Sequence, residues 1–154
     1  MKENFLDKNF TLFGKDMNSP DANTDTGGIQ LNYRNILNTI TEGIYAIDHN
    51  GLCVYANNAC WQILGFGSGS DVLGQNMHRL VHYKHANGEV YPGRQCKIGK
   101  ALREGIEIVA DDEVFWHKSG KAIPVRYHAY PQFKQNELIG AVVSFYDISQ
   151  EQLQ

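Results

Sequence analysis

The sequence contains no apolar run long enough to cross a bilayer, and it lacks the usual marks of a secreted protein. Its longest apolar stretch, near residues 138–146, is far shorter than the roughly 20 residues that a membrane-spanning helix needs. The N-terminus, MKENFLDKNF, has no basic start followed by a long apolar core, so it does not look like a signal peptide. We therefore expect a soluble, cytoplasmic domain that makes no membrane contact itself.

Cysteine and excess charge are also scarce. Three cysteines, Cys53, Cys60 and Cys96, form an odd set without CxxC spacing, which indicates free thiols in a reducing compartment. The 14 Lys and Arg and the 17 Asp and Glu are interspersed and give a net charge of -3. Because nucleic-acid binding calls for a basic face, we expect no nucleic-acid partner. The length of 154 residues suits one domain.

The N-terminal stretch differs in character from the rest of the chain. Residues 1–28 are polar and include SPDANTDTGG, so they bury too little apolar surface to order themselves, and we expect a flexible arm or linker. The domain proper is expected over residues 29–148. It should begin with an amphipathic helix at residues 31–41, which could cover a sheet or pair two chains. Four apolar residues give this helix its stripe: Tyr33, Ile36, Leu37 and Ile40.

The stretch GIYAIDHNGLCVYANNACWQILGF, residues 43–66, predicts a strand, a tight turn, a second strand and a short helix. Two apolar, β-prone segments flank the turn sequence DHNG. Asp and Asn bond back to the local backbone, and Gly allows a positive φ, so this tetrapeptide suits a reversing turn. Asn57 is placed to cap the helix, and Gly65 is placed to end it.

The second half of the chain predicts helices followed by long strands. Helical patterns cover residues 71–83 and 95–103, with a loop rich in turn residues between them. Strand patterns cover residues 106–117, 122–133 and 138–147, joined by short turns. Two strands, then helices, then three antiparallel strands predict an α+β fold with its helices on one side of the sheet.

The last residues indicate a continuation. Ser149-Gln150-Glu151-Gln152 has the Ser and Gln spacing of a capping box, so a helix should begin there. A helix that ends at Gln154 is too short to be stable alone. We therefore expect residues 149–154 to start a C-terminal helix that leads into another domain of a longer protein.

Several short motifs occur in a characteristic order along the chain. They are Gly43-Ile44-Tyr45-Ala46-Ile47-Asp48, Asn50-Gly51, Tyr55-Ala56-Asn57, Leu64-Gly65-Phe66, Ser119-Gly120, Ile139-Gly140 and Asp147-Ile148-Ser149. In this order and spacing the chain resembles a PAS domain, the sensor module of bacterial signal-transduction proteins such as sensor histidine kinases. The resemblance covers about residues 31–154. Residues 85–96 are also similar to an insert found in one subgroup of sensor-kinase PAS domains.

The resemblance implies a PAS-like five-stranded antiparallel sheet in the order 2-1-5-4-3, a pocket between sheet and helices, and output through a C-terminal signalling helix. Asp147, Ile148 and Ser149 are the output residues that it implies. Strand alternation and the resemblance together predict a mainly apolar and aromatic pocket, with His82 and Tyr127 as polar contacts. The predicted lining residues are Ile47, Met77, Leu80, His82, Phe115, Val125, Tyr127 and Phe145.

A flavin adduct and a haem are both disfavoured, and the ligand stays unknown. The reactive cysteine of light-sensing LOV-type PAS domains corresponds to Met77, whose thioether cannot form the adduct. The flavin-binding amide positions correspond to Phe115, Val125 and Phe145, none of which carries a side-chain amide. The helix before the long strands has no His for haem iron, although Cys96 could ligate as a thiolate.

A metal site is weighed for three histidines. His78, His82 and His85 would share one face of a predicted helix, where neutral imidazoles could hold zinc with an open position. Asn87-Gly88 should end the helix early, and no carboxylate nearby in the sequence orients the rings. We therefore predict no metal site, and expect a solvated polar face with one His closing the pocket.

We also expect no enzymatic activity in this domain. It has no Gly-x-Ser-x-Gly elbow, P-loop or HExxH motif. The acidic run Asp111-Asp112-Glu113 could suggest paired carboxylates, but consecutive side chains on a strand point to opposite faces, so a converging pair is poorly placed. We expect a solvated strand bend instead.

Two functions from different classes remain. The first is a homodimeric sensory domain that binds a small apolar or amphipathic ligand and relays the signal to a histidine kinase or a cyclic-di-GMP enzyme in the parent chain. The second is a ligand-free PAS module for dimerisation, with its pocket filled by its own side chains. A cavity of a few hundred cubic ångströms would favour the sensor, and a filled core would favour the dimerisation module.

Overall fold

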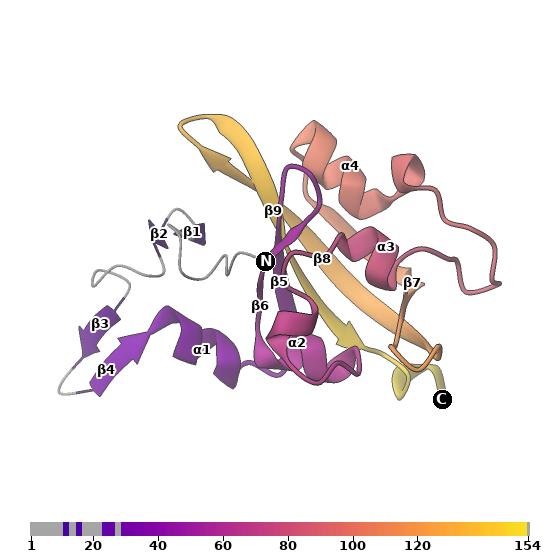
Figure 1. The fold of residues 1–154 in the computed structure, drawn as a ribbon, viewed down its shortest axis with the longest axis horizontal. Helices are drawn as coiled ribbons and strands as arrows, with labels where there is room; N and C mark the ends of the chain where they lie inside the picture. The colour runs from indigo at the N-terminus through magenta and orange to yellow at the C-terminus, as the bar shows by residue number, and fades with distance from the viewer. Residues whose placement is uncertain (1–10, 13–14, 17–22, 27–28, 154) are drawn as a thin grey trace.

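A five-stranded antiparallel sheet organises the domain (Figure 1). The structure, a computed structural model, describes residues 11–12, 15–16, 23–26 and 29–153. The strands of the sheet are β5 (Gly43–Asp48), β6 (Cys53–Ala56), β7 (Ile108–Trp116), β8 (Ala122–Lys134) and β9 (Glu137–Asp147). They lie in the order β6-β5-β9-β8-β7, which is the predicted order 2-1-5-4-3. The predicted α+β fold is therefore confirmed.

The first hairpin turns where its residue types predict. Asp48 Oδ1 accepts hydrogen bonds from the backbone N–H groups of Asn50, at 2.9 Å, and Leu52, at 3.0 Å. Gly51 takes the left-handed conformation with a φ of 80°. The Asx-type bonds and the positive φ together reverse the chain between β5 and β6.

Asn57 is a fully buried polar residue that joins three elements. Its Oδ1 accepts hydrogen bonds from the N–H of Cys60, at 2.9 Å, which caps α2 (Asn58–Ile63), and from the N–H of Ile44 on β5, at 2.8 Å. Its Nδ2 donates to the carbonyl oxygens of Leu37 and Glu42, each at 3.0 Å. The predicted N-cap is confirmed, and the amide uses both its donors and both its acceptor lone pairs.

Helices cover both faces of the sheet. α2, α3 (Met77–Val81) and α4 (Lys97–Glu104) lie over one face, so the predicted one-sided arrangement holds for these three helices but not for α1 (Figure 1). α1 (Tyr33–Thr39) lies on the other face, where Leu37 packs in a cluster with Ile44, Ala46 and Val142. The predicted apolar stripe of the N-terminal helix therefore covers the sheet.

Two helices are shorter or shifted relative to their sequence patterns. Of residues 71–83, only Met77–Val81 forms an α-helix, because Gly74 adopts a φ of 79° and a bridge from Asn76 to Leu52 holds the preceding segment beside β6. The short 3-10 turns η3 (Gly69–Asp71) and η4 (Gly93–Gln95) precede α3 and α4. α4 ends at Gly105, which has a φ of 67°.

Short elements flank the domain. Two small antiparallel ladders precede α1: β1 (Thr11–Leu12) with β2 (Lys15–Asp16), and β3 (Asn23–Thr26) with β4 (Ile29–Asn32). The rest of the predicted arm, residues 1–28, lies outside the described residues. After β9, the 3-10 turn η5 (Glu151–Leu153) stands where the C-terminal helix is predicted to begin. Within the described ranges, no helix combines the length and apolar character needed to cross a membrane.

Candidate functional site

A cavity of about 330 Å³ opens beside α3 and α4 over the β5 side of the sheet. Apolar walls come from Ile47, Met77 and Ile98. His78 and Cys96 are among the polar groups that face into it. The lining is polar and apolar in similar measure, and a hollow in which polar groups converge beside apolar walls is a usual form of small-molecule site.

The predicted pocket residues divide into two groups. Ile47, Met77 and His82 line the cavity. The predicted residues that do not line it are Leu80, Phe115, Val125, Tyr127 and Phe145. Four of these five are fully buried, and the Phe115 and Phe145 rings pack edge to face with centroids 5.0 Å apart, so the aromatic side chains fill the space nearest the sheet. Leu80 is half-buried on α3 and packs at the margin of this core.

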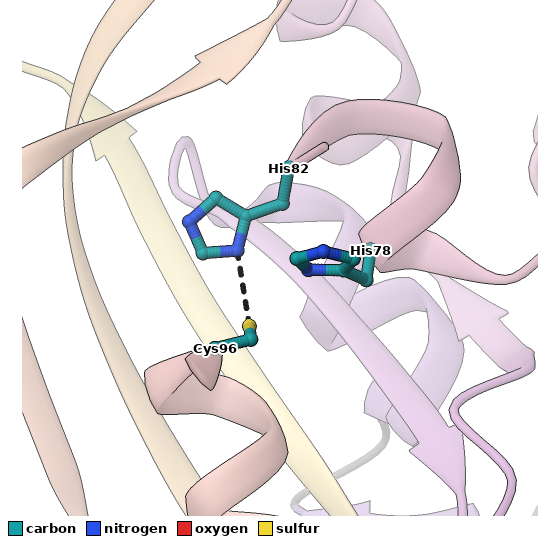
Figure 2. A group of neighbouring side chains, drawn as sticks. All are labelled: His78, His82 and Cys96. Carbon is teal, nitrogen blue, oxygen red and sulfur yellow. Dashed lines mark hydrogen bonds between the residues drawn. The ribbon is translucent and has the colours of Figure 1, made fainter. Parts of the chain in front are cut away.

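Three potential metal ligands converge at one wall of the cavity. His78 and His82 are one turn apart at α3, and Cys96 stands at the N-cap of α4. Figure 2 shows the two imidazoles and the thiol directed toward one another. One ligand atom from each lies within 4.8 Å of the other two, and His82 Nδ1 is 3.3 Å from Cys96 Sγ.

The far nitrogen of each imidazole has a fixed partner. His78 Nε2 is 2.7 Å from the carbonyl oxygen of Tyr91, and His82 Nε2 is 2.7 Å from Glu113 Oε1. A carbonyl and a carboxylate accept hydrogen bonds, so both Nε2 atoms carry protons and donate them. His78 Nδ1 is buried without a hydrogen-bond partner in the described part of the chain.

Glu113 belongs to the site, and the expectation that it is solvated is wrong. The register of β7 against β8 shifts between Ala110 and Glu113, which marks a β-bulge. The bulge leaves Asp111 and Asp112 exposed and turns Glu113 inward, with a side chain only 10% exposed. An irregularity of the strand was expected at this acidic run, and the bulge is one, but Glu113 itself is not solvated.

Glu113 is held from several directions. Tyr127 OH donates to its Oε1 at 2.8 Å, and Lys97 Nζ lies 3.4 Å from its Oε2. The carboxylate that contacts the His82 ring is therefore not one of its neighbours in the sequence, which were the positions considered above. The orienting group is distant in the sequence and reaches His82 through the fold.

Burial and hydrogen bonding pull the pKa values of the site in opposite directions. Burial lowers the pKa of His82, but Cys96 and Glu113 outweigh it, so that the pKa is raised overall. Burial raises the pKa of Cys96, but the neighbouring imidazoles of His78 and His82 bring it below the usual thiol value. Burial likewise raises the pKa of Glu113, and His82 and Tyr127 lower it overall. Glu113 is thus a carboxylate, and Cys96 and His82 share a proton.

The three histidines weighed from the sequence do not share one helical face, and the expected solvated polar face does not form, because His82 is buried. α3 ends at Val81, so His85 lies beyond the helix and stacks on the Tyr91 ring, with centroids 4.2 Å apart. Cys96, fourteen positions after His82, stands beside the two remaining histidines.

The predicted output residues form a turn at the end of β9. Asp147 Oδ1 accepts hydrogen bonds from the N–H of Ser149, at 2.8 Å, and from its hydroxyl. Ile148 is buried, and its N–H donates to the carbonyl of Pro124 at 2.9 Å. The segment that leaves the domain is therefore tied to the sheet by a side-chain turn and a backbone bond.

A second link fastens this segment to β8. Arg126 reaches Glu151 Oε2 at 2.8 Å and donates to the Tyr146 hydroxyl at 2.8 Å. Both partners raise the pKa of the Arg126 guanidinium. The ion pair is exposed and contributes little stability on its own, but it defines the path of the chain after β9.

Comparisons with known proteins agree on the architecture. A protein-family model described as the PAS fold matches residues 31–148. The chain is similar to the PAS domain of nitrogen regulation protein NR(II) from Vibrio parahaemolyticus, with 19% identity over 75% of this chain and 97% of that chain, and a TM-score of 0.58. It is also similar to the PAS domain of a Colwellia psychrerythraea protein, with 18% identity, coverages of 77% and 95%, and a TM-score of 0.64.

A third similar structure is a PAS domain from a two-component sensor histidine kinase, with 14% identity, coverages of 75% and 92%, and a TM-score of 0.59. No curated protein matches the chain. At identities this low, the solved structures establish a shared fold and nothing finer.

Proposed function

The chain belongs to the PAS family, and from this premise we propose that it is a sensory domain that binds a small molecule between its sheet and helices and relays that binding to an output domain. PAS domains are regulatory modules, commonly sensory in signal transduction. The observation that carries the proposal is the cavity of about 330 Å³ beside α3 and α4. Small-molecule sites typically measure roughly 300–1,000 Å³, so a modest ligand fits.

The walls of the cavity indicate the chemistry of the ligand. Ile47, Met77 and Ile98 offer an apolar surface, while His78 and Cys96 offer polar atoms at one wall. A small apolar or amphipathic molecule, with one polar group directed at His78, uses both. The domain itself performs no reaction in this proposal and contacts neither nucleic acid nor membrane.

The relay works as a population shift. A ligand that fits one packing of α3 and α4 over the sheet better than another moves the equilibrium by its differential affinity. The cavity wall connects to β7 through the His82–Glu113 bond of 2.7 Å, and β7, β8 and β9 are neighbours in the sheet. The shift leaves through β9 to Asp147, Ile148 and Ser149, and from there to a histidine kinase or cyclic-di-GMP enzyme in a longer, cytoplasmic parent chain.

A ligand-free dimerisation module is the second candidate. Apolar side chains remain exposed at Val109, by 62%, and Phe133, by 53%, and Ile36 on α1 is 37% exposed. A second copy of the chain could cover such positions, and a homodimer is compatible with either function. What separates the two candidates is whether the cavity holds a ligand.

Native mass spectrometry of the purified chain tests the proposal, because it reports retained ligand and oligomeric state together. Ile98→Phe places a larger side chain in the cavity wall, and Leu80→Phe makes a comparable change on α3 away from the cavity lining. We expect a retained small-molecule mass in the wild type and in Leu80→Phe, and its loss in Ile98→Phe. A dimer without any added mass in the wild type would favour the dimerisation module instead.

A further inference from the structure

We propose that His78, His82 and Cys96 form a binding site for a soft or borderline transition-metal ion, with zinc(II) the first to test, and that the fourth coordination position opens into the cavity. This ligand set differs from the three histidines considered from the sequence, because Cys96 takes the place of His85. The inference goes beyond ligand sensing and does not depend on it, since a metal could bind here whether or not an organic ligand does.

The spacing of the donor atoms suits a single ion. Zinc binds thiolate sulfur at about 2.3 Å and imidazole nitrogen at about 2.0–2.1 Å, so tetrahedral donors lie about 3.3–3.6 Å apart. His82 Nδ1 and Cys96 Sγ are already 3.3 Å apart, and all three donors lie within 4.8 Å of one another. The largest separation in the group is therefore at most about 1.5 Å longer than tetrahedral coordination needs.

The positions of the imidazole protons show which nitrogen of His78 can bind an ion. His78 donates its Nε2 proton to the Tyr91 carbonyl, so in the neutral ring its Nδ1 is an acceptor, and this buried atom has no hydrogen-bond partner among the described residues. A buried polar atom left unpaired is destabilising, so it needs an explanation. A hydrogen-bonded core network would account for His82 and Cys96, but it does not account for His78 Nδ1.

Metal binding at these atoms is a balanced exchange. Cys96 Sγ and His82 Nδ1 share one proton, because His82 Nε2 already donates to Glu113. An incoming dication takes the place of that proton and receives electron pairs from Sγ, His82 Nδ1 and His78 Nδ1. One proton is released for each ion bound, as expected for a thiolate ligand.

The groups behind the ligands are those that a metal site requires. Metal-binding histidines almost always donate their other N–H to a carboxylate or a backbone carbonyl, which fixes the tautomer and aims the ring. His82 donates to the Glu113 carboxylate, and His78 donates to the Tyr91 carbonyl, both at 2.7 Å. Both outer partners are therefore already in place without an ion.

The fourth position and the choice of metal follow from the cavity. All three ligands line it, as does Met77, so a water molecule or an added ligand can complete the coordination. Two imidazoles and a thiolate suit zinc, and a thioether nearby also suits cuprous copper. The preference between the two ions is therefore part of the test.

The experiment is a titration of the reduced, chelator-treated chain with zinc(II) against a chromophoric chelator, repeated with copper(I) in the absence of oxygen. His78→Gln and Cys96→Ser each remove one ligand. His85→Gln and Cys60→Ala are matched controls, since His85 stacks outside the group and Cys60 is a buried thiol in α2. We expect one ion per chain, a loss of affinity of more than about 100-fold in the ligand variants, and changes within about threefold in the controls.

Cobalt(II) substitution gives a readout that does not depend on any variant. A thiolate-to-cobalt charge-transfer band and intense tetrahedral d–d bands are expected in the wild type, and circular dichroism checks that each variant is folded. Tight copper(I) binding that is lost in the same two variants supports the site with a softer ion. Equal affinities in ligand and control variants, or a cobalt spectrum without a thiolate band, would overturn the proposal.

Discussion

The helical layer over the sheet contains two buried polar centres, and they differ in how fully their hydrogen bonds are made. Asn57 and His82 are buried polar side chains at these two centres, with exposures of 0% and 1%. The Asn57 amide is paired on every donor and acceptor with backbone groups of α1, α2 and β5 or the segments beside them. The centre around His82 includes the buried Nδ1 of His78, which has no hydrogen-bond partner within the ranges that the structure describes.

This difference indicates that the Asn57 centre holds the fold together, whereas the centre around His82 is suited to binding. A fully paired buried amide has nothing left to offer a ligand, so its bonds can only hold elements together. An unpaired nitrogen beside a thiol and a second imidazole, at the wall of a cavity, has a lone pair available for an ion or a ligand. The cluster of His78, His82 and Cys96 therefore contributes less to stability than it could and is available for binding. Asn57 contributes to stability alone.

The largest expected effect on stability comes from removing the paired centre. Asn57→Ala should lower the free energy of unfolding by about 3 kcal/mol or more, because it removes a helix cap and leaves buried backbone groups unpaired. Urea denaturation measures this, with the exposed neighbour Asn58→Ala as a control that should change it by less than about 0.5 kcal/mol. The zinc affinity of the folded Asn57→Ala protein should be unchanged. A large loss of zinc affinity would show that Asn57 also supports the metal site, against the proposed division of roles.

The next largest effect is expected on zinc affinity, when the Glu113 carboxylate that contacts His82 is removed. Glu113→Gln should weaken zinc binding about 10- to 100-fold, because it removes the carboxylate that receives the His82 proton. Asp112→Asn removes the same charge from the exposed, adjacent position, 3.5 Å from Lys97, and should have little effect. Chelator competition compares the two, and equal losses would mean that overall charge, and not ring orientation, sets the affinity.

A smaller effect on stability, with a separate readout, is expected at the exit from the sheet. Asp147→Ala removes the acceptor for the Ser149 N–H and hydroxyl and should cost about 1 kcal/mol, as lost caps do. Zinc affinity should stay the same, while the output activity of the full-length parent should stop responding to the stimulus. Glu137→Ala, an exposed acid at the opposite end of β9, is the control. A normal response in Asp147→Ala would count against this route of output.

The smallest effect is expected at the exposed edge of the site. Lys97 is 45% exposed and lies 3.4 Å from Glu113 and 3.5 Å from Asp112, so solvent weakens both ion pairs. Lys97→Met should change the free energy of unfolding by less than about 1 kcal/mol and zinc affinity by less than about threefold. Urea denaturation and chelator competition at two salt concentrations measure both quantities. A loss as large as that of Glu113→Gln would show that Lys97, and not His82, fixes the carboxylate.

Local patterns predicted most of the scaffold. The turn at Gly51, the cap at Asn57 and the helix end at Gly65 depend on nearby residues, and the sequence motifs implied the strand order. The helix expected over residues 71–83 was too long, because one glycine with a positive φ breaks a pattern that apolar spacing alone continues.

The site was only partly predictable, because its members are distant in the sequence. Three of the predicted pocket residues do line the cavity: Ile47, Met77 and His82. Cys96 meets His82 across 14 residues, and Glu113, next to the bulge in β7, meets it across 31. Periodicity within one element carries no information about such contacts, because the partners lie on different elements.

X-ray absorption at the zinc edge of the zinc-loaded chain tests the central claim most directly. We expect a first shell with one sulfur at about 2.3 Å and two imidazole nitrogens at about 2.0–2.1 Å, completed by one light atom. The sulfur should disappear in Cys96→Ser and persist in Cys60→Ala. A shell of nitrogen and oxygen without sulfur in the wild type would show that the unpaired centre of the domain is not where the metal binds.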